Sequence, residues 1–317
     1  GGSHKTCLDV LVRHLPYQWT LETAPSHHWK WRMRGSAAWF ANRIRARIAS
    51  GEGWDLLLAT SFLPLTELIG LIPELAAIPR LLYFHENQLA YPVAPGRKDK
   101  RDIHFGLSQL VSSLGATVVA FNSEWNRDSF LAEGRTILRK VPDMVRPGWI
   151  EEIDSKSRVL YPVVEFPDAA LDYGDSVGPD ERALGPIILW NHRWEFDKGP
   201  DAFFEALLRL QQAGIPFRLA VAGESFNAKP RVFARTKKLL SQNIVQWGFM
   251  EDREAYIRLL SRAHIVVSTA DHEFFGISML EATFLGARPV VPDRLSYREL
   301  FPAQFRYSND EALFSTL

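Results

Sequence analysis

Two carboxylates eight positions apart, Glu273 and Glu281, lie in the stretch ADHEFFGISMLEATFLGARPVV. Within one continuous α-helix, eight residues correspond to about 80° of rotation and roughly 12 Å of rise, which is too far for both to contact one atom. If the helix begins near Gly276, Glu273 lies in the preceding loop, and the two side chains could bind two parts of an elongated ligand. The backbone N–H groups of Phe275, Gly276 and Ile277 would form a positive helix end suited to a diphosphate. A capping glutamate with a separate surface glutamate is the alternative.

A pair of cations lies in the stretch WNHRWEFDKGPDAFFEALL of the same half of the sequence. Arg193 and Lys198 are five positions apart, in a predicted loop between a buried strand and a helix. A guanidinium fork and a point cation at the carboxyl end of a strand suit the diphosphate of a leaving nucleotide. On its own such a loop is more often a solvated turn, but its combination with the glutamate pair favours a binding site.

Four consecutive polar residues follow a predicted buried strand in LLYFHENQLAYPV, and they are His85, Glu86, Asn87 and Gln88. Burying four polar side chains there is costly unless they contact a ligand or one another. The pattern predicts a ligand site at the end of this strand, with a structural hydrogen-bond network as the alternative.

The elements that must position these residues are predicted by short apolar runs that alternate with amphipathic helical stretches. Buried strands are predicted at residues 55–61, 80–86, 117–123, 158–164, 186–192, 217–224, 244–249, 264–269 and 288–293. An acidic segment rich in Pro and Gly predicts a linker over residues 166–185. We therefore expect an α/β protein with two Rossmann-like, doubly wound domains, residues 1–165 and 186–317, that face a cleft. Ligands of such sheets lie beyond the carboxyl ends of the strands.

Composition narrows the class of protein. Lys plus Arg and Asp plus Glu both number 37, although the first 54 residues carry eight Lys or Arg against three Asp or Glu. This excludes a uniformly basic surface but not a local basic patch. The one cysteine, Cys7, excludes an internal disulfide and favours a reducing compartment, by default the cytoplasm. We expect no membrane association, since no apolar run is typical of a transmembrane helix and none follows GGSHK as in a signal peptide.

The C-terminal half resembles the donor domain of family-four retaining glycosyltransferases with the GT-B fold, over about residues 186–300. The resemblance rests on Arg193 followed by Lys198-Gly199-Pro200, VAGE at 221–224, QWGFMEDREAYIRLLSRAHIVVST and the glutamate spacing. It implies that Arg193 and Lys198 contact the donor diphosphate in a catalytic role. It also implies that Glu273 is a catalytic residue that contacts the donor sugar and that Glu281 contacts the ribose. The sequence contains no D-x-D motif, which agrees with chemistry that needs no metal and no other cofactor.

The N-terminal half resembles one family more specifically, the tRNA-queuosine mannosyltransferases, which are also described as glycosyltransferase-like domain-containing proteins. HENQLAYP is the most specific part, and GGSHK, HHWKWRMR and VVAFNSEWNRDSFL extend the resemblance over nearly the whole chain. It implies transfer of mannose from GDP-mannose to a cyclopentene-diol hydroxyl of queuosine in a tRNA, tRNA-Asp by resemblance, with the α configuration retained. His85 would contact the donor sugar or the reacting centre, and Glu86, Asn87 and Gln88 would shape the acceptor side.

The same resemblance implies that GGSHK is native and forms a glycine loop after a first strand upstream of residue 1, although a cloning remnant explains GGSH equally well. Gly1 and Gly2 would then let the backbone approach the donor. The other donor-binding residues that it implies are Gly223, Glu224, Phe249, Met250, Phe274, Phe275, Gly276 and Ile277.

A tRNA acceptor would explain the stretch SHHWKWRMRG at residues 26–35, which concentrates rings and cations. Arg and Lys neutralise phosphates, while Trp and His offer stacking surfaces to unpaired bases. The predicted RNA contacts are Trp29, Lys30, Trp31, Arg32 and Arg34. A second basic cluster, GRKDKRDIHFG at 96–106, would extend the contact.

The helix predicted after this stretch, over residues 36–51, places apolar and basic residues on different faces. Phe40, Ile44 and Ile48 share one face, and Arg43 and Arg47 lie on another. For Trp39 and Trp54 we expect a place in the core.

Two other functional classes stay open. A sugar-nucleotide epimerase, or a GT-B transferase with a small or lipid acceptor, would keep the C-terminal features but would not need the basic and aromatic N-terminal stretch. A non-catalytic two-domain binding protein would form no product. GDP-mannose, as opposed to another nucleotide sugar, follows from the resemblance alone.

Overall fold

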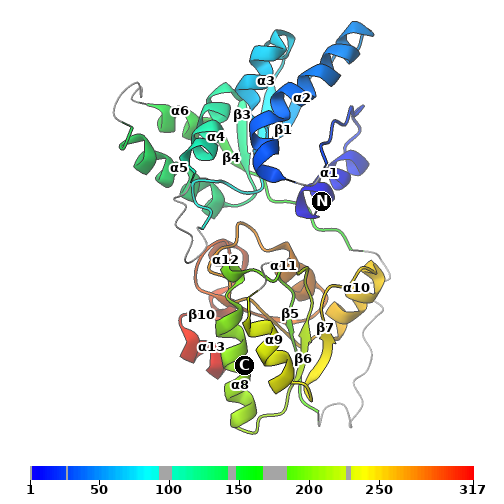
Figure 1. Ribbon diagram of the computed structural model, residues 1–317, viewed down its shortest axis with the longest axis vertical. Helices are drawn as coiled ribbons and strands as arrows, with labels where there is room; N and C mark the ends of the chain where they lie inside the picture. Colours follow the sequence, from blue (N-terminus) through cyan, green and yellow to red (C-terminus); the bar gives the residue numbers. More distant parts are fainter. Residues whose placement is uncertain (1, 26–27, 93–101, 142–147, 167–183, 226–229) are drawn as a thin grey trace. The chain divides into compact units, whose positions relative to one another are not determined.

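The computed structural model of the chain describes residues 2–25, 28–92, 102–141, 148–166, 184–225 and 230–317. The chain divides into two compact units, Gly1–Val163 and Val164–Leu317, and each contains a parallel β-sheet with helices packed on it (Figure 1). The linker predicted over residues 166–185 lies almost entirely outside the described residues and stays a prediction. No helix among the described residues is long and apolar enough to cross a membrane.

The sheet of the first unit has four parallel strands in the order β1-β2-β3-β4. The strands are β1 (Leu57–Thr60), β2 (Arg80–Phe84), β3 (Val118–Phe121) and β4 (Ser157–Val159). The helices are α1 (Gly2–His14), α2 (Trp29–Ala49), α3 (Leu65–Leu71), the 3-10 helix η1 (Pro73–Ala77), α4 (Ile103–Gly115), α5 (Glu124–Leu138) and α6 (Trp149–Ser155). Leu82, Phe84 and Phe121 are fully buried in the core, as expected when helices cover both faces of a parallel sheet.

The four strands predicted for this unit are all present, each shorter than its predicted run, and β4 departs most from its prediction. β4 ends at Val159, and the side chains of Leu160 and Val163 are exposed. Pro162 has no backbone N–H and therefore cannot extend the ladder of hydrogen bonds.

Helix α1 begins at Gly2, so the prediction of a glycine loop at this position is wrong for Gly2. Gly1 lies outside the described residues. The residues after Gly2 form a helix that packs on the sheet, since Cys7 is buried against Tyr83 of β2 and Ala120 of β3.

Helix α2 begins at Trp29 and not at Ser36, so most of the basic and aromatic stretch is helical. Met33 and Ala37 are buried and extend the apolar face of the helix toward its N-terminus. The predicted apolar face is confirmed, since Ile44 is buried against α3 and η1 and Phe40 and Ile48 pack beside it.

The sheet of the second unit has six parallel strands in the order β10-β9-β8-β5-β6-β7. The strands are β5 (Ile187–Trp190), β6 (Arg218–Val221), β7 (Ile244–Trp247), β8 (Ile265–Val267), β9 (Arg288–Pro292) and β10 (Arg306–Tyr307). The helices are η3 (Phe196–Lys198), α8 (Pro200–Gln212), α9 (Val232–Leu239), α10 (Arg253–Arg262), α11 (Ile277–Phe284), α12 (Tyr297–Leu300), η4 (Ala303–Phe305) and α13 (Asp310–Thr316). The five strands predicted here are confirmed, and the two-residue β10 is too short to give an apolar pattern.

This strand order is that of a Rossmann fold, and its chain order reverses between the neighbouring strands β5 and β8. The loops after these two strands are fastened together. Thr269 Oγ1 donates a hydrogen bond of 3.0 Å to the carbonyl oxygen of Lys198. Gly199, at φ 60°, packs so closely that a Cβ there would lie 2.1 Å from the carbonyl oxygen of Thr269. Only glycine fits this approach, which brings Lys198 to the loop that carries Glu273.

Candidate active site

The loops after β5 and β8 bring Lys198 and Glu273 together. Lys198 Nζ lies 3.2 Å from Glu273 Oε2 and donates a hydrogen bond of 2.7 Å to the carbonyl oxygen of His272. The carboxylate of Asp197 lies 3.5 Å from the same ammonium. Lys198 is 6% exposed, so this charge is compensated inside the protein. The structure thus joins two of the predicted catalytic residues into one ion pair, in which the side chain of Lys198 is 7% exposed and that of Glu273 is 19% exposed.

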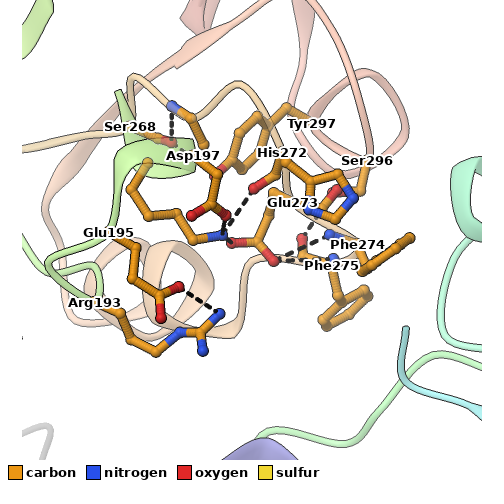
Figure 2. Close-up of polar contacts among 12 residues, drawn as sticks. Arg193, Glu195, Asp197, Ser268, His272, Glu273, Phe274, Phe275, Ser296 and Tyr297 are labelled. Atoms are coloured by element: carbon orange, nitrogen blue, oxygen red, sulfur yellow. Dashed lines mark hydrogen bonds and ion pairs between the residues drawn. The ribbon is translucent and has the colours of Figure 1, made fainter. Parts of the chain in front are cut away.

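Glu273 is fixed as a charged carboxylate. Its Oε1 accepts hydrogen bonds from the backbone N–H groups of Phe274 at 3.1 Å and Phe275 at 3.4 Å (Figure 2). Burial alone would raise the pKa of Glu273, but the Lys198 ammonium and the other partners lower it to about 2. The N–H group of Phe275, predicted to face a diphosphate, therefore points to the side chain of Glu273 in this structure.

Helix α11 begins at Ile277 after Gly276, which has φ 95°, and this confirms the predicted helix start. Glu273 therefore lies in the loop, while Glu281 lies in the helix and has a different partner, the guanidinium of Arg253. Asn191, just after β5, donates a hydrogen bond of 2.9 Å to the carbonyl oxygen of Ser278 in the first turn of α11. The two glutamates are separate acceptors on one rigid support, as the spacing predicts.

Two residues that sequence reasoning missed support the loop of Glu273. Ser296 is fully buried, and its Oγ donates a hydrogen bond of 3.1 Å to the carbonyl oxygen of Phe275 (Figure 2). The ring of Tyr297 lies under Gly276, where an added Cβ would be 3.0 Å from its Cε1, and its hydroxyl lies 2.7 Å from that of Ser268. Both residues follow β9, so polar residues at the end of the next strand are the signal that could have found them.

His192, just after the end of β5, is a third residue that sequence reasoning missed. It is buried, and its Nε2 has no hydrogen-bond partner among the described residues. Burial, followed by the charge of Lys198, lowers the pKa of His192 to about 4, although Glu273 opposes this. His192 is therefore a neutral imidazole beside the ion pair.

The remaining predicted donor residues lie in the loops after β5, β6 and β7. The side chain of Arg193 is 46% exposed and lies 3.2 Å from the carboxylate of Glu195. A Cβ on Gly223 would lie 1.9 Å from the carbonyl oxygen of His192, and the carbonyl oxygen of Glu224 accepts a hydrogen bond from Trp194 N at 2.9 Å. Phe249, in the loop after β7, is exposed, and Met250 beside it is half-buried.

At the end of β2 in the first unit, His85 is 8% exposed and packs against another histidine. The ring centroids of His85 and His4 are 4.0 Å apart, and the ring centroid of Tyr83 lies 4.7 Å from that of His85 in an edge-to-face arrangement. Burial, followed by the proximity of His4, lowers the pKa of His85 to about 2. His85 is therefore neutral, and a neutral imidazole can donate or accept one hydrogen bond but carries no charge.

Asn87 belongs to a buried network between β2 and α5. It is fully buried; its Nδ2 donates to Asn126 Oδ1 at 2.8 Å and its Oδ1 accepts from the N–H of Ala90 at 2.7 Å. These contacts favour the structural alternative for Asn87. Gln88 Nε2 donates a hydrogen bond of 3.2 Å to Glu86 Oε1, which places these two predicted acceptor residues side by side.

The arginines and tryptophans of α2 have different surroundings. Trp31 is 76% exposed, and the ring of Trp29 lies against those of Phe62 and Phe105. The ammonium of Lys30 lies over the ring of Trp29. Arg34 forms an ion pair of 2.9 Å with Asp102. The five predicted RNA contacts thus lie on one helix, but they are not equally available. Residues 96–101 of the second basic cluster lie outside the described residues.

The prediction that Trp39 lies in the core is wrong. Trp39 is 40% exposed, and the guanidinium of Arg43 lies 5.0 Å from its ring centroid. Trp54 packs half-buried against the cluster between α2 and α3. The predicted basic face is not freely solvated, since Arg43 and Arg47 both form ion pairs with Glu22.

Comparison with known proteins identifies two family models. Residues 1–164 match the model of the tRNA-queuosine alpha-mannosyltransferase N-terminal domain, and residues 180–306 match that of glycosyl transferases group 1. The chain is 37% identical over 323 residues to a tRNA-queuosine alpha-mannosyltransferase of Drosophila melanogaster, covering all of this chain and 83% of that protein. A GDP-mannose-dependent alpha-(1-6)-phosphatidylinositol dimannoside mannosyltransferase of Mycobacterium tuberculosis is 32% identical over 37% of this chain and 30% of its own length.

Solved structures show the fold. The Anabaena HepE protein in complex with UDP has a TM-score of 0.60 at 14% identity, over 88% of this chain and 70% of that chain. A glycosyltransferase from Rickettsia africae has a TM-score of 0.60 at 18% identity, over 98% of this chain and 76% of its own. The two Rossmann-like units are those of the GT-B fold.

Proposed function

The chain belongs to the tRNA-queuosine alpha-mannosyltransferase family, and from this premise we propose that it transfers mannose from GDP-mannose to a cyclopentene-diol hydroxyl of queuosine in tRNA-Asp, with retention of the α configuration. The observation that carries the proposal is the 37% identity to a family member over the whole chain. GDP-mannose also appears in the name of a relative that matches part of the chain.

The charged residues at the end of β5 and β8 would bind the donor. Lys198 and Arg193 would stabilise the negative charge that develops on the diphosphate as the bond to the anomeric carbon breaks. Glu273, as a carboxylate, would accept hydrogen bonds from sugar hydroxyls, and Glu281 from the ribose. In a front-face route the acceptor hydroxyl attacks the anomeric carbon on the side of the leaving group, and its proton passes to the leaving phosphate oxygen. No enzymatic nucleophile is then required, and positioning supplies much of the rate.

The first unit would bind the acceptor. The exposed ring of Trp31, with Trp29 and the cations Lys30, Arg32 and Arg34, offers stacking and phosphate contacts to an RNA loop. His85, with Glu86 and Gln88 beside it, would contact the reacting sugar or the nucleoside by hydrogen bonds.

The test is incubation of the purified protein with queuosine-containing tRNA and a panel of GDP-mannose, UDP-glucose and UDP-galactose, followed by mass spectrometry of the nucleosides. We expect one hexose added to queuosine from GDP-mannose only, and no product on the same tRNA with guanosine in place of queuosine. EDTA should leave the rate unchanged because we propose a metal-independent reaction. Addition from a UDP-sugar alone would overturn the donor assignment, and absence of any product on queuosine would overturn the acceptor.

A further inference from the structure

The arginines of α2 differ in whether the protein supplies a partner for them. Four of its five arginines have one: Arg34 pairs with Asp102, Arg43 and Arg47 pair with Glu22, and Arg45 donates to the carbonyl oxygen of Leu71. Arg32 has neither a hydrogen-bond acceptor nor an ion-pair partner among the residues that the structure describes. Its side chain is half-buried, and the Nε atom is buried without an acceptor.

A buried donor without an acceptor destabilises the folded protein unless a ligand supplies the missing oxygen. The contacts that the structure gives the Arg32 side chain are with rings, and none of them accepts a hydrogen bond from its Nε. Its guanidinium carbon lies 5.9 Å from the centroid of Phe62, and the ring of His4 lies 5.4 Å from Phe62. Burial, followed by nearby positive charge that includes Arg32, lowers the pKa of His4 to about 4, so this imidazole is neutral.

The same neighbours place Arg32 close to the predicted reaction centre. His4 stacks on His85 at 4.0 Å, and Phe62 contacts Trp29 at a ring-centroid distance of 6.4 Å. A row of rings thus runs from the end of β2 to the first turn of α2, with a guanidinium over it. Flat rings beside a cation are typical of sites that bind the phosphate and the base of single-stranded RNA.

We propose that Arg32, flanked by Phe62 and His4, binds a backbone phosphate of the acceptor RNA next to the nucleoside that His85 contacts. This deepens the proposed function and rests on it for the identity of the RNA. The guanidinium fork donates two charge-assisted hydrogen bonds to a phosphate, which satisfies the buried Nε. The diphosphate of the donor is the other source of such a group, and the experiment separates the two.

The test compares Arg32→Gln and Arg32→Lys with Arg45→Gln, a matched loss of charge on the same helix. Binding is measured by fluorescence anisotropy over a series of salt concentrations, with queuosine-containing tRNA and with the same tRNA carrying guanosine. For Arg32→Gln we expect roughly tenfold weaker binding of both tRNAs. The slope of log affinity against log salt should fall by roughly 0.7–0.9. Arg45→Gln should change neither quantity to this extent.

Arg32→Lys should keep most of the salt slope but bind more weakly, because a lysine retains the charge without the fork. GDP-mannose binding, measured by calorimetry, should equal that of the unchanged protein in all three variants. Unchanged tRNA binding in Arg32→Gln, an equal loss in Arg45→Gln, or a loss confined to GDP-mannose would each overturn the proposal. Failure of the mannosyl transfer assay would instead overturn the proposed function, because tRNA binding is measured without it.

Discussion

The strand ends of the two units bury polar side chains in opposite ways. In the second unit Lys198, beyond β5, lies between the carboxylates of Asp197 and Glu273, and these charges compensate one another. In the first unit the buried side chains His85 and Asn87 at the end of β2 are uncharged: the pKa of His85 is lowered to about 2 and that of His4 beside it to about 4, and Asn87 is bonded to other amides.

This difference suits different ligands. In a charged cluster the ammonium can exchange one carboxylate partner for a diphosphate. Its positive charge is paired with an anion in either state, so no charge is left buried without a partner. A neutral end discriminates through the direction of hydrogen bonds, which suits the hydroxyl groups of a sugar or a nucleoside. From this comparison we predict that single substitutions harm the second unit through a lost charge and the first unit through lost hydrogen bonds.

The largest expected effect is that of Lys198→Ala. Turnover with GDP-mannose and queuosine-containing tRNA should fall about 100-fold or more, because the positive charge that stabilises the leaving diphosphate is lost. The free energy of unfolding should fall by about 3 kcal/mol, since the largely covered carboxylate of Glu273 is left without its ammonium. Lys238→Ala, an exposed change in the same unit, is the control. Near-normal turnover in Lys198→Ala would reject the role of this charge.

Asn87→Ala tests the first unit in the same way. The contacts of Asn87 Nδ2 with Asn126 and Ser129 and the hydrogen bond that its Oδ1 accepts from Ala90 are lost, so we expect a decrease of about 3 kcal/mol in the free energy of unfolding, measured by urea denaturation. The affinity for tRNA, measured on the folded fraction, should change little. Unchanged stability with weaker tRNA binding would instead return Asn87 to the acceptor site that the sequence predicts for it.

The sequence predicts which residues lie at the strand ends but not how they pair. Lys198 and Glu273 are 75 positions apart, and their contact depends on the adjacency of β5 and β8, which no local pattern encodes. Asn87 follows a buried strand in the sequence, yet its structural role depends on Asn126 of α5. Residue type and strand position were therefore predictable, whereas the partner of each polar atom was not.

The error at Trp39 has a local cause. Adjacent helix positions point about 100° apart, so Trp39 and Phe40 cannot both face the core. Phe40 packs on the cluster of α2 and α3, and Trp39 is left at the edge, where Arg43 covers it. A large aromatic side chain indicated burial, but the apolar spacing of its neighbours decided which ring is buried.

Acid should destabilise both units through their buried neutral histidines. The pKa of His192 is lowered from 6.5 to about 4 by burial and then by Lys198, and that of His85 to about 2 by burial and then by His4. The unfolded chain therefore binds protons below pH 6.5 that the folded chain does not, and stability present above pH 6.5 is lost as the pH falls, down to about 4 for His192 and about 2 for His85. At pH 5 each histidine should cost about 2 kcal/mol relative to pH 7.5.

The measurement is urea unfolding at pH 7.5 and pH 5. His192→Gln should lose about 2 kcal/mol less than the unchanged protein between these values, while His14→Gln, an exposed control, should lose as much as the unchanged protein. Glu273 acts in a separate window, because its pKa of about 2 leaves its contribution intact until the pH falls below 4.5. Equal pH dependence in all three proteins would contradict the neutral state of His192.

The smallest expected effect is that of Ser296→Ala, which removes a contact behind the charged cluster without touching a charge. The hydroxyl of Ser296 donates to the carbonyl oxygen of Phe275, so its loss should free the loop that aligns Glu273. Loss of one hydrogen bond costs about 1 kcal/mol. We therefore expect the KM for GDP-mannose to rise roughly fivefold, with a smaller change in kcat. Ser296→Thr should restore the KM, and the exposed Ser241→Ala should leave it unchanged. A lower melting temperature with an unaltered KM would mean that Ser296 supports the fold and not the alignment of the glutamate.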